Sequence, residues 1–132
     1  MDTLLVDTSV LLDLVTEDAM WFDWSSRQIE ALAEKHLLAI NPVIYAELSP
    51  VFDQRRELDR CLASFTRLDL PYEAAWAAGK AHEQYARRGG HRLVPLPDFL
   101  IGAHAEVAGL RLLTRDARRI RTYFPRVALV CP

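Results

Sequence analysis

Cysteine is scarce in this sequence, and that scarcity limits what the protein can be. Only Cys61 and Cys131 occur among the 132 residues. Two thiols this far apart in sequence are too few for a disulfide framework or a cysteine-based zinc site. We therefore expect free thiols, with Cys61 packed inside a helix.

Long apolar runs are also missing. No apolar segment approaches the roughly 20 residues that span a bilayer, and the start of the chain has no basic flank before an apolar stretch. The composition is 51% hydrophobic and 26% charged, which suits a globular domain with one core. We expect a single domain over residues 1–132, located in the cytoplasm, with no membrane partner.

The sequence also lacks an excess of positive charge. The formal net charge is −2, so contact with nucleic acid would depend on a local cluster and not on overall charge. Arginines do gather late in the chain, among them Arg115, Arg118 and Arg119. These side chains form either a solvated face or a rim that contacts RNA phosphates.

What the sequence does contain is an alternation of strand-like and helix-like segments. Expected strands cover residues 4–6, 37–40, 67–70, 110–113 and 127–130, and expected helices cover 9–17, 20–36, 42–49, 53–66, 71–88, 98–109 and 117–123. Pro50 should end its helix near Ser49, because proline has no backbone donor. This alternation predicts an α/β fold with three layers, α/β/α, around a mostly parallel sheet.

Four acidic residues stand where the pattern calls for apolar or turn residues. Asp7 and Asp116 each follow an expected strand, and Asp98 opens a helix after Pro97. Glu47 interrupts the apolar stripe of its helix, where an unpaired carboxylate is costly to bury. Because residues just past the carboxyl ends of parallel strands face one crevice, we expect the four to converge. Mg²⁺ or Mn²⁺, which prefer oxygen ligands, would offset their mutual repulsion.

Each acid also has a purely structural interpretation. Aspartate at a strand-to-helix junction often caps the helix or lies in its first turn, which would account for Asp7, Asp98 and Asp116 one at a time. Gly102 lies one turn after Asp98 on the same helix face and is expected to leave space beside the carboxylate. Asp13 is expected on the polar side of the first helix, as a structural residue.

Two further groups have both structural and functional interpretations. No histidine is selected for the site, because the four lack any mutual ligand spacing: His36, His82, His91 and His104. Trp21, Phe22 and Trp24 cannot all face one direction on a helix, so at least one should reach the surface. They either belong to the core or border a groove for a partner peptide.

Four segments taken together resemble a known family. They are Val6-Asp7-Thr8-Ser9-Val10, Tyr45-Ala46-Glu47-Leu48, Pro97-Asp98-Phe99-Leu100-Ile101-Gly102-Ala103-His104-Ala105 and Leu113-Thr114-Arg115-Asp116. In order and spacing, the set is similar to PIN-domain ribonucleases of the VapC toxin type. The similarity covers essentially the whole chain.

The resemblance implies a Mg²⁺- or Mn²⁺-dependent endoribonuclease, the toxin of a toxin–antitoxin pair, restrained by a small antitoxin protein and often homodimeric. By position it implies a catalytic and metal-binding quartet of Asp7, Glu47, Asp98 and Asp116, with the first three as direct ligands. It also implies supporting polar roles for Thr8 or Ser9 and for Thr114. A carboxylate-held metal can activate water and neutralise charge on a leaving oxygen, which suits phosphodiester hydrolysis.

Two other functions stay open on the sequence alone. One is a PIN-fold binding module with weak or no catalysis, whose metal site is structural. The other is a metal-dependent signalling domain in which an aspartate is phosphorylated. That domain would require paired acids directly after the first strand and a lysine near the end of the last one, whereas lysine occurs only at positions 35 and 80.

Overall fold

The central sheet contains five parallel strands. The computed structural model describes residues 1–89 and 96–132. Across the sheet the strands lie in the order β3 (Thr66–Arg67), β2 (His36–Ile40), β1 (Asp2–Val6), β4 (Arg111–Leu113) and β5 (Leu129–Val130), and every neighbouring pair is parallel. Leu4, Leu5 and Val6 of β1 are fully buried, as expected for a strand covered on both faces. The predicted α/β fold is confirmed.

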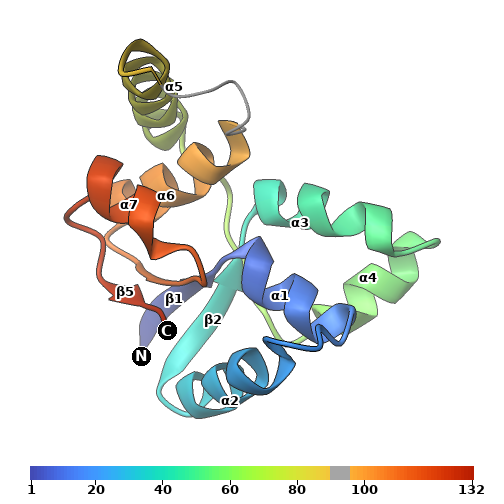
Figure 1. The fold of residues 1–132 in the computed structure, drawn as a ribbon. Helices are drawn as coiled ribbons and strands as arrows, with labels where there is room; N and C mark the ends of the chain where they lie inside the picture. The colour runs from blue at the N-terminus through green and yellow to red at the C-terminus, as the bar shows by residue number, and fades with distance from the viewer. Residues whose placement is uncertain (90–95) are drawn as a thin grey trace.

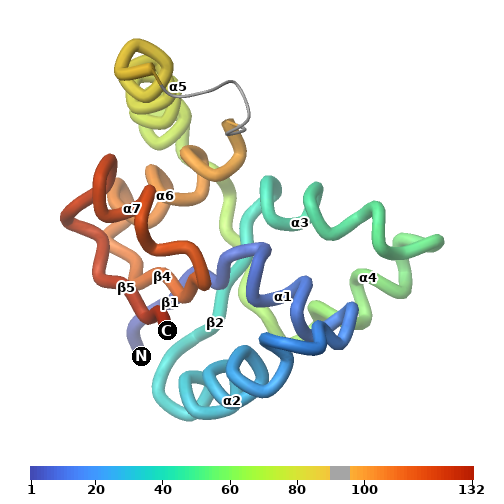
Figure 2. Tube along the Cα trace, in the orientation of Figure 1, coloured from blue at the N-terminus to red at the C-terminus, as the bar shows by residue number. Residues whose placement is uncertain are grey.

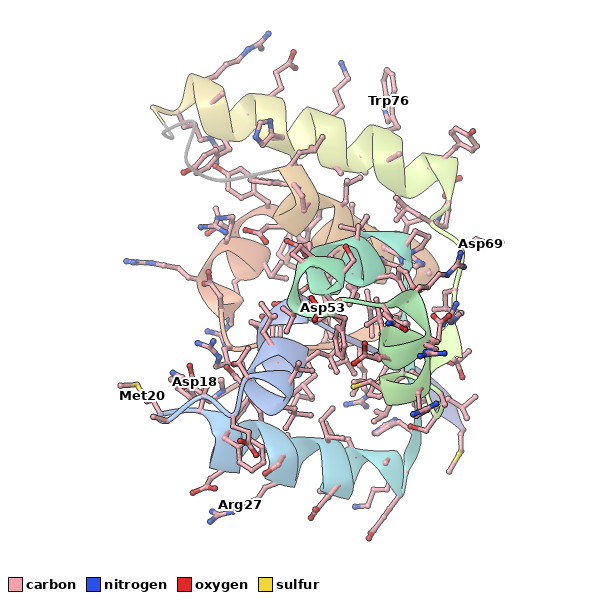
Figure 3. All side chains as sticks on the ribbon, turned by 90° about the vertical axis from the view of Figure 1, so that its right-hand side faces the viewer. Asp18, Met20, Arg27, Asp53, Asp69 and Trp76 are labelled. Atoms are coloured by element: carbon pink, nitrogen blue, oxygen red, sulfur yellow. The ribbon has the colours of Figure 1, made fainter. Side chains whose placement is uncertain are left out.

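Helices cover the sheet in two groups, as Figures 1 and 2 show. The helices α1 (Thr8–Val15), α2 (Phe22–Ala33), α3 (Pro42–Leu48) and α4 (Arg55–Cys61) lie to the right of and below the strands, and α5 (Tyr72–Arg87), α6 (Leu96–Ala108) and α7 (Ala117–Tyr123) lie at the upper left. Helix α5 packs mainly along α6 and presents its other side to solvent, where Trp76 projects away from the molecule (Figure 3). Within the described residues, no helix is long and apolar enough to cross a membrane.

The start and end of α3 follow from local chemistry. The Asn41 side chain accepts a hydrogen bond of 2.9 Å from the backbone N–H of Ile44, and Pro42 occupies the first turn, where its missing N–H costs nothing. At the other end α3 stops at Leu48, and a 3-10 turn over Ser49–Val51 accommodates Pro50. Both the asparagine cap and the break near Ser49 were predicted correctly.

Other boundaries differ from the prediction. Helix α4 covers only Arg55–Cys61, and Cys61 is exposed at its end, so the expectation that this thiol packs inside a helix is wrong. Helix α6 begins at Leu96, which places Asp98 in its first turn instead of at its start. His91 lies outside the described residues, and so does most of the expected loop at 91–97. Both cysteines are free thiols, as predicted.

Two side-chain placements are also corrections. Gly102 does not leave space beside Asp98: a Cβ on Gly102 would lie 2.6 Å from Phe124 Cδ2 and 2.9 Å from Ile120 Cδ1, so the missing side chain lets α6 and α7 approach closely. Asp13 does not lie on a polar face. It is 1% exposed, because α2 packs against α1 on that side.

Candidate active site

Asp7 follows β1 directly and is held by two hydroxyl groups, one from nearby in the sequence and one from the end of β4. Its Oδ2 accepts hydrogen bonds from Ser9 Oγ at 2.9 Å and from Thr114 Oγ1 at 2.7 Å. Thr114 reaches Asp7 because β4 pairs with β1, and the backbone N–H of Asp7 donates to the carbonyl of Leu113 at 2.9 Å. Burial raises the pKa of Asp7, and the two hydroxyl donors only partly oppose that shift.

Glu47 lies on α3 and is tied to the residue after Asp7. The hydroxyl of Thr8 donates to Glu47 Oε1 at 2.7 Å. The pKa of Glu47 is raised, first by burial and then by the negative charge of Asp7, while the Thr8 hydrogen bond acts in the opposite direction. The two hydroxyls left open as alternatives in the sequence thus have separate partners: Thr8 supports Glu47, and Ser9 supports Asp7.

Asp98, in the first turn of α6, has a strongly raised pKa. Burial raises its pKa to about 6, with further increases from the charges of Asp7, Glu47 and Asp116, against a lowering by Arg119. Arg119 Nη1 donates to Asp98 Oδ2 at 2.9 Å. These interactions place Asp98 within the electrostatic range of the other three carboxylates.

Asp116 is the most exposed acid of the quartet, with 61% of its side chain accessible. Its backbone N–H donates to Thr114 Oγ1 at 3.0 Å, so one threonine hydroxyl joins Asp116 to Asp7. Its Oδ2 lies 3.8 Å from Arg119 Nη1. Asp116 is thus held by its backbone while its carboxylate stays at the rim.

The capping interpretation fails for two of the four acids. Asp7 precedes α1 and Asp116 precedes α7, but neither side chain makes a capping hydrogen bond. Both residues instead line a hollow of about 30 Å³, together with Asp98, Ile101, Leu112, Thr114, Arg119 and Ile120. Glu47 is connected to this pocket through Thr8 and does not line it.

The oxygen ligands of these side chains suit a hard divalent cation, although their arrangement is not that of a formed metal site. Carboxylate and hydroxyl oxygens are the ligands that Mg²⁺ and Mn²⁺ prefer. Three of the acids have raised pKa values because of burial and mutual repulsion, and a bound cation would lower these pKa values again. In residues 1–89 and 96–132, no three His, Cys, Asp or Glu side chains already have the geometry to hold an ion. Asp98 is instead paired with Arg119.

The arginines selected from the sequence have different surroundings. Arg115 Nε and Nη2 donate to the two oxygens of Asp13 at 2.7 and 2.9 Å, and its guanidinium lies 5.2 Å from the Trp21 ring centroid. Arg119 lies inside the acidic pocket and not on its rim, whereas Arg118 is exposed. The guanidinium of Arg115 is therefore largely committed to holding α1 and α2 against the end of β4.

Two supporting contacts were not foreseen. Asn41 Nδ2 lies 2.9 Å from His104 Nδ1, a buried contact that joins the start of α3 to the middle of α6. His104 is thus a satisfied core residue, and burial lowers its pKa, which favours the neutral ring. The contact of Arg119 with Asp116 could have been expected from spacing, because Arg119 lies three residues after Asp116, which precedes α7. Nothing in the sequence connects Asn41 with His104.

Comparison with known proteins identifies the class. The PIN domain family model matches residues 4–128, and the chain belongs to the PIN-domain family. PIN domains are generally nucleases. No curated protein matches the chain.

Solved structures of toxin–antitoxin complexes share the fold. VapBC2 from Rickettsia felis, bound to a DNA fragment from its promoter, matches with a TM-score of 0.74 and 17% identity over 98% of both chains. VapBC-1 from nontypeable Haemophilus influenzae matches with a TM-score of 0.73 and 16% identity, over 98% of this chain and 97% of that one. A toxin–antitoxin complex from Klebsiella pneumoniae gives 0.69 and 22% over 95% of both. The predicted resemblance to VapC-type PIN domains is confirmed at the level of the fold.

Proposed function

We propose that this PIN-domain protein is a Mg²⁺- or Mn²⁺-dependent endoribonuclease that acts as the toxin of a toxin–antitoxin pair. The observation that carries the proposal is the convergence of Asp7, Asp98 and Asp116, from three separate elements, on one small pocket. Hydroxyl groups and an arginine hold the carboxylates there, and the side chains of Asp7 and Asp116 make no capping hydrogen bond. Such a pocket is expensive to maintain unless it binds a cation.

In this proposal Asp7, Glu47 and Asp98 hold the metal, and Asp116 completes the site from its exposed rim. When bound, the cation supplies Lewis acidity for activating water and neutralising a leaving oxygen. The chain's own contribution is orientation: Thr114 and Ser9 fix the carboxylate of Asp7, and Thr8 fixes that of Glu47. Asp98, whose pKa is about 6, loses its proton near neutral pH, when a cation can replace it.

The substrate contacts are assigned to two arginines, one inside the acidic pocket and one exposed beside it. Arg118 is exposed next to Asp116, and Arg119 reaches the pocket itself. A phosphodiester that approaches this acidic site needs local positive charge, which the overall charge of −2 does not supply. Arg115 is already bonded to Asp13, so we assign it to holding the site and leave RNA contact to Arg118 and Arg119.

The partners proposed for the chain are an antitoxin protein and a second copy of itself, in the cytoplasm. One similar structure is a toxin–antitoxin complex from Klebsiella pneumoniae, and another is a member of the VapBC family of toxin–antitoxin systems from Mycobacterium tuberculosis. Trp21 and Trp24 are half-buried, and their ring centroids are 5.9 Å apart in an edge-on pair. Phe22 is half-buried beside them, and Met20 is 78% exposed. An amphipathic antitoxin helix would cover this apolar edge of α2.

The test is cleavage of RNA by the purified chain. Wild type, incubated with total cellular RNA and Mg²⁺, should release discrete fragments, and chelation by EDTA should stop the release. Asp98→Asn should abolish turnover while still binding RNA, because the arginines remain. Retained metal binding without any cleavage would instead favour the alternative of a catalytically weak PIN-fold binding module. Family membership leaves no support for a signalling domain.

A further inference from the structure

A second, larger hollow adjoins the acidic pocket. It has a volume of about 310 Å³, lies between the end of α5 and α7, and is lined by Tyr85, Asp116, Arg118, Arg119, Thr122 and Tyr123. Asp116 and Arg119 also line the acidic pocket, so the two hollows share one wall. A ligand in the larger hollow would therefore lie directly beside the proposed reaction centre.

The aromatic side of this hollow is firmly supported. The Tyr85 and Tyr123 ring centroids are 6.0 Å apart with the rings at 75°, and both rings pack on Phe99, at 5.6 and 5.3 Å between centroids. Phe99 is 1% exposed, whereas the two tyrosines are only half-buried. The buried phenylalanine thus fixes two rings that keep part of their surface towards the hollow.

The other side of the hollow carries positive charge. Arg118 is exposed, and within residues 1–89 and 96–132 it forms no ion pair with an acid. Arg88 adds a second cation near the tyrosines, with its guanidinium 5.9 Å from the Tyr123 ring centroid. Ring faces beside guanidinium groups suit a planar base attached to a phosphate.

We propose that this hollow binds one base of single-stranded RNA, next to the phosphodiester held at the acidic pocket. The base stacks on the Tyr85–Tyr123 wall, and Arg118 contacts the neighbouring phosphate. The proposal rests on the ribonuclease function proposed above. A volume of about 310 Å³ is at the small end of ligand pockets, which suits a single nucleotide. A paired base is not available for stacking in this way, so the subsite selects unpaired RNA.

The test compares RNA with and without bases. Fluorescein-labelled short oligouridylate, and an abasic ribose-phosphate chain of the same length, are titrated into the cleavage-inactive Asp98→Asn protein and followed by anisotropy. In that background Tyr123→Leu should weaken oligouridylate binding by roughly 5- to 150-fold, the range for loss of one stacked base. Binding of the abasic chain should not change. Tyr123→Phe keeps the ring and should bind oligouridylate as the parent does.

Two control variants and one titration of the wild-type protein separate stacking from other effects. Tyr72 is also a tyrosine of α5, but it is 94% exposed, so Tyr72→Leu should leave both affinities unchanged. Arg118→Gln should weaken binding of the oligouridylate and of the abasic chain alike, because the phosphate contact does not depend on a base.

In case Tyr123→Leu unfolds, the wild-type protein is titrated with uridine 5′-monophosphate and with ribose 5-phosphate. Tyrosine ring NMR signals should shift for the first ligand only.

The outcomes distinguish this proposal from the function it rests on. Equal affinity for base-bearing and abasic chains, or Tyr123→Phe binding as poorly as Tyr123→Leu, would overturn the base subsite even if wild type cleaves RNA. Absence of both RNA cleavage by wild type and RNA binding by Asp98→Asn would overturn the ribonuclease function and the subsite together. A base-dependent loss on Tyr123→Leu, with cleavage by wild type, supports both.

Discussion

The guanidinium of Arg119 lies between two of the acids of the pocket: Nη1 is 2.9 Å from Asp98 Oδ2 and 3.8 Å from Asp116 Oδ2. Its positive charge lowers the pKa of Asp98, although burial and three neighbouring carboxylates raise it more strongly. Arg119 therefore offsets part of the repulsion that a divalent cation would remove. A metal that binds Asp98 competes with this arginine for the same oxygen.

Arg119→Gln should accordingly tighten metal binding. Removal of the competing charge is expected to lower the Kd for Mg²⁺ by roughly tenfold, equivalent to about 1.4 kcal/mol, as measured by isothermal titration calorimetry. Arg118→Gln is the matched control one residue earlier, and it should leave the Kd unchanged because Arg118 does not line the acidic pocket. Weaker Mg²⁺ binding by Arg119→Gln would show that the arginine positions Asp98 and does not compete for it.

The acids of the pocket should make the metal-free protein less stable as pH rises. The pKa of Asp98 is about 6 in the folded protein against an ordinary value of 3.8, and those of Asp7 and Glu47 are also raised. A raised carboxyl pKa favours the protonated folded state, so its stabilising contribution is complete below about pH 4 and is lost as pH rises to about 6. Urea unfolding of wild type without metal should show this decline.

Asp98→Asn supplies the control for that experiment. The difference in unfolding free energy between Asp98→Asn and wild type should grow from about pH 4 to about pH 6 and then level off. Saturating Mg²⁺ at neutral pH should restore stability to wild type more than to the variant. A difference that does not change with pH would mean that Asp98 has its ordinary pKa in the folded protein.

The ion pair between Arg115 and Asp13 should contribute strongly to stability. Only 2% of the Asp13 side chain is exposed, so Arg115→Gln leaves a buried charge with Ser25 as its remaining side-chain donor. The expected loss is about 3–5 kcal/mol in chemical denaturation. Arg67→Gln breaks the exposed pair with Asp59 and should change stability little. Adding Asp13→Asn to Arg115→Gln should recover part of the loss, because no charge is then left buried.

Two glycines of helices α5 and α6 should respond in opposite directions to alanine. Gly102→Ala forces its Cβ against Phe124 and Ile120, and overpacking of this kind costs about 1–3 kcal/mol. Gly79 lies in α5 with nothing within 4 Å of a Cβ, so Gly79→Ala should stabilise the protein by about 0.4–1 kcal/mol. Melting temperatures measured side by side will check the pair. Equal shifts for both would mean that α6 and α7 adjust freely around position 102.

The sequence predicted the parallel sheet, and it placed Asp7 and Asp116 just after strands, because those features depend on local pattern. Strand and helix periodicity, Asn41 before Pro42 and the break at Pro50 are all local signals. The sequence did not predict the burial of Asp13, because the helix that covers this side chain is α2 and its partner Arg115 is 102 residues away. The role of Gly102 was misjudged for the same reason: the atoms that fill its space belong to α7. Contacts between distant elements leave no periodic trace in a single sequence.

The hydrogen bond from Thr114 to Asp7 joins residues 107 positions apart, through the pairing of β1 with β4. Asp98 and Asp116 enter the pocket from the same late part of the chain. During synthesis, therefore, the first hundred residues contain the central strand and three of the four acids, but they lack Thr114 and Asp116. The site forms only when the last third of the chain has left the ribosome and β4 has inserted beside β1. A chain that ends before β4 carries Asp7 and Glu47 without Thr114 and Asp116, so the proposed site stays incomplete.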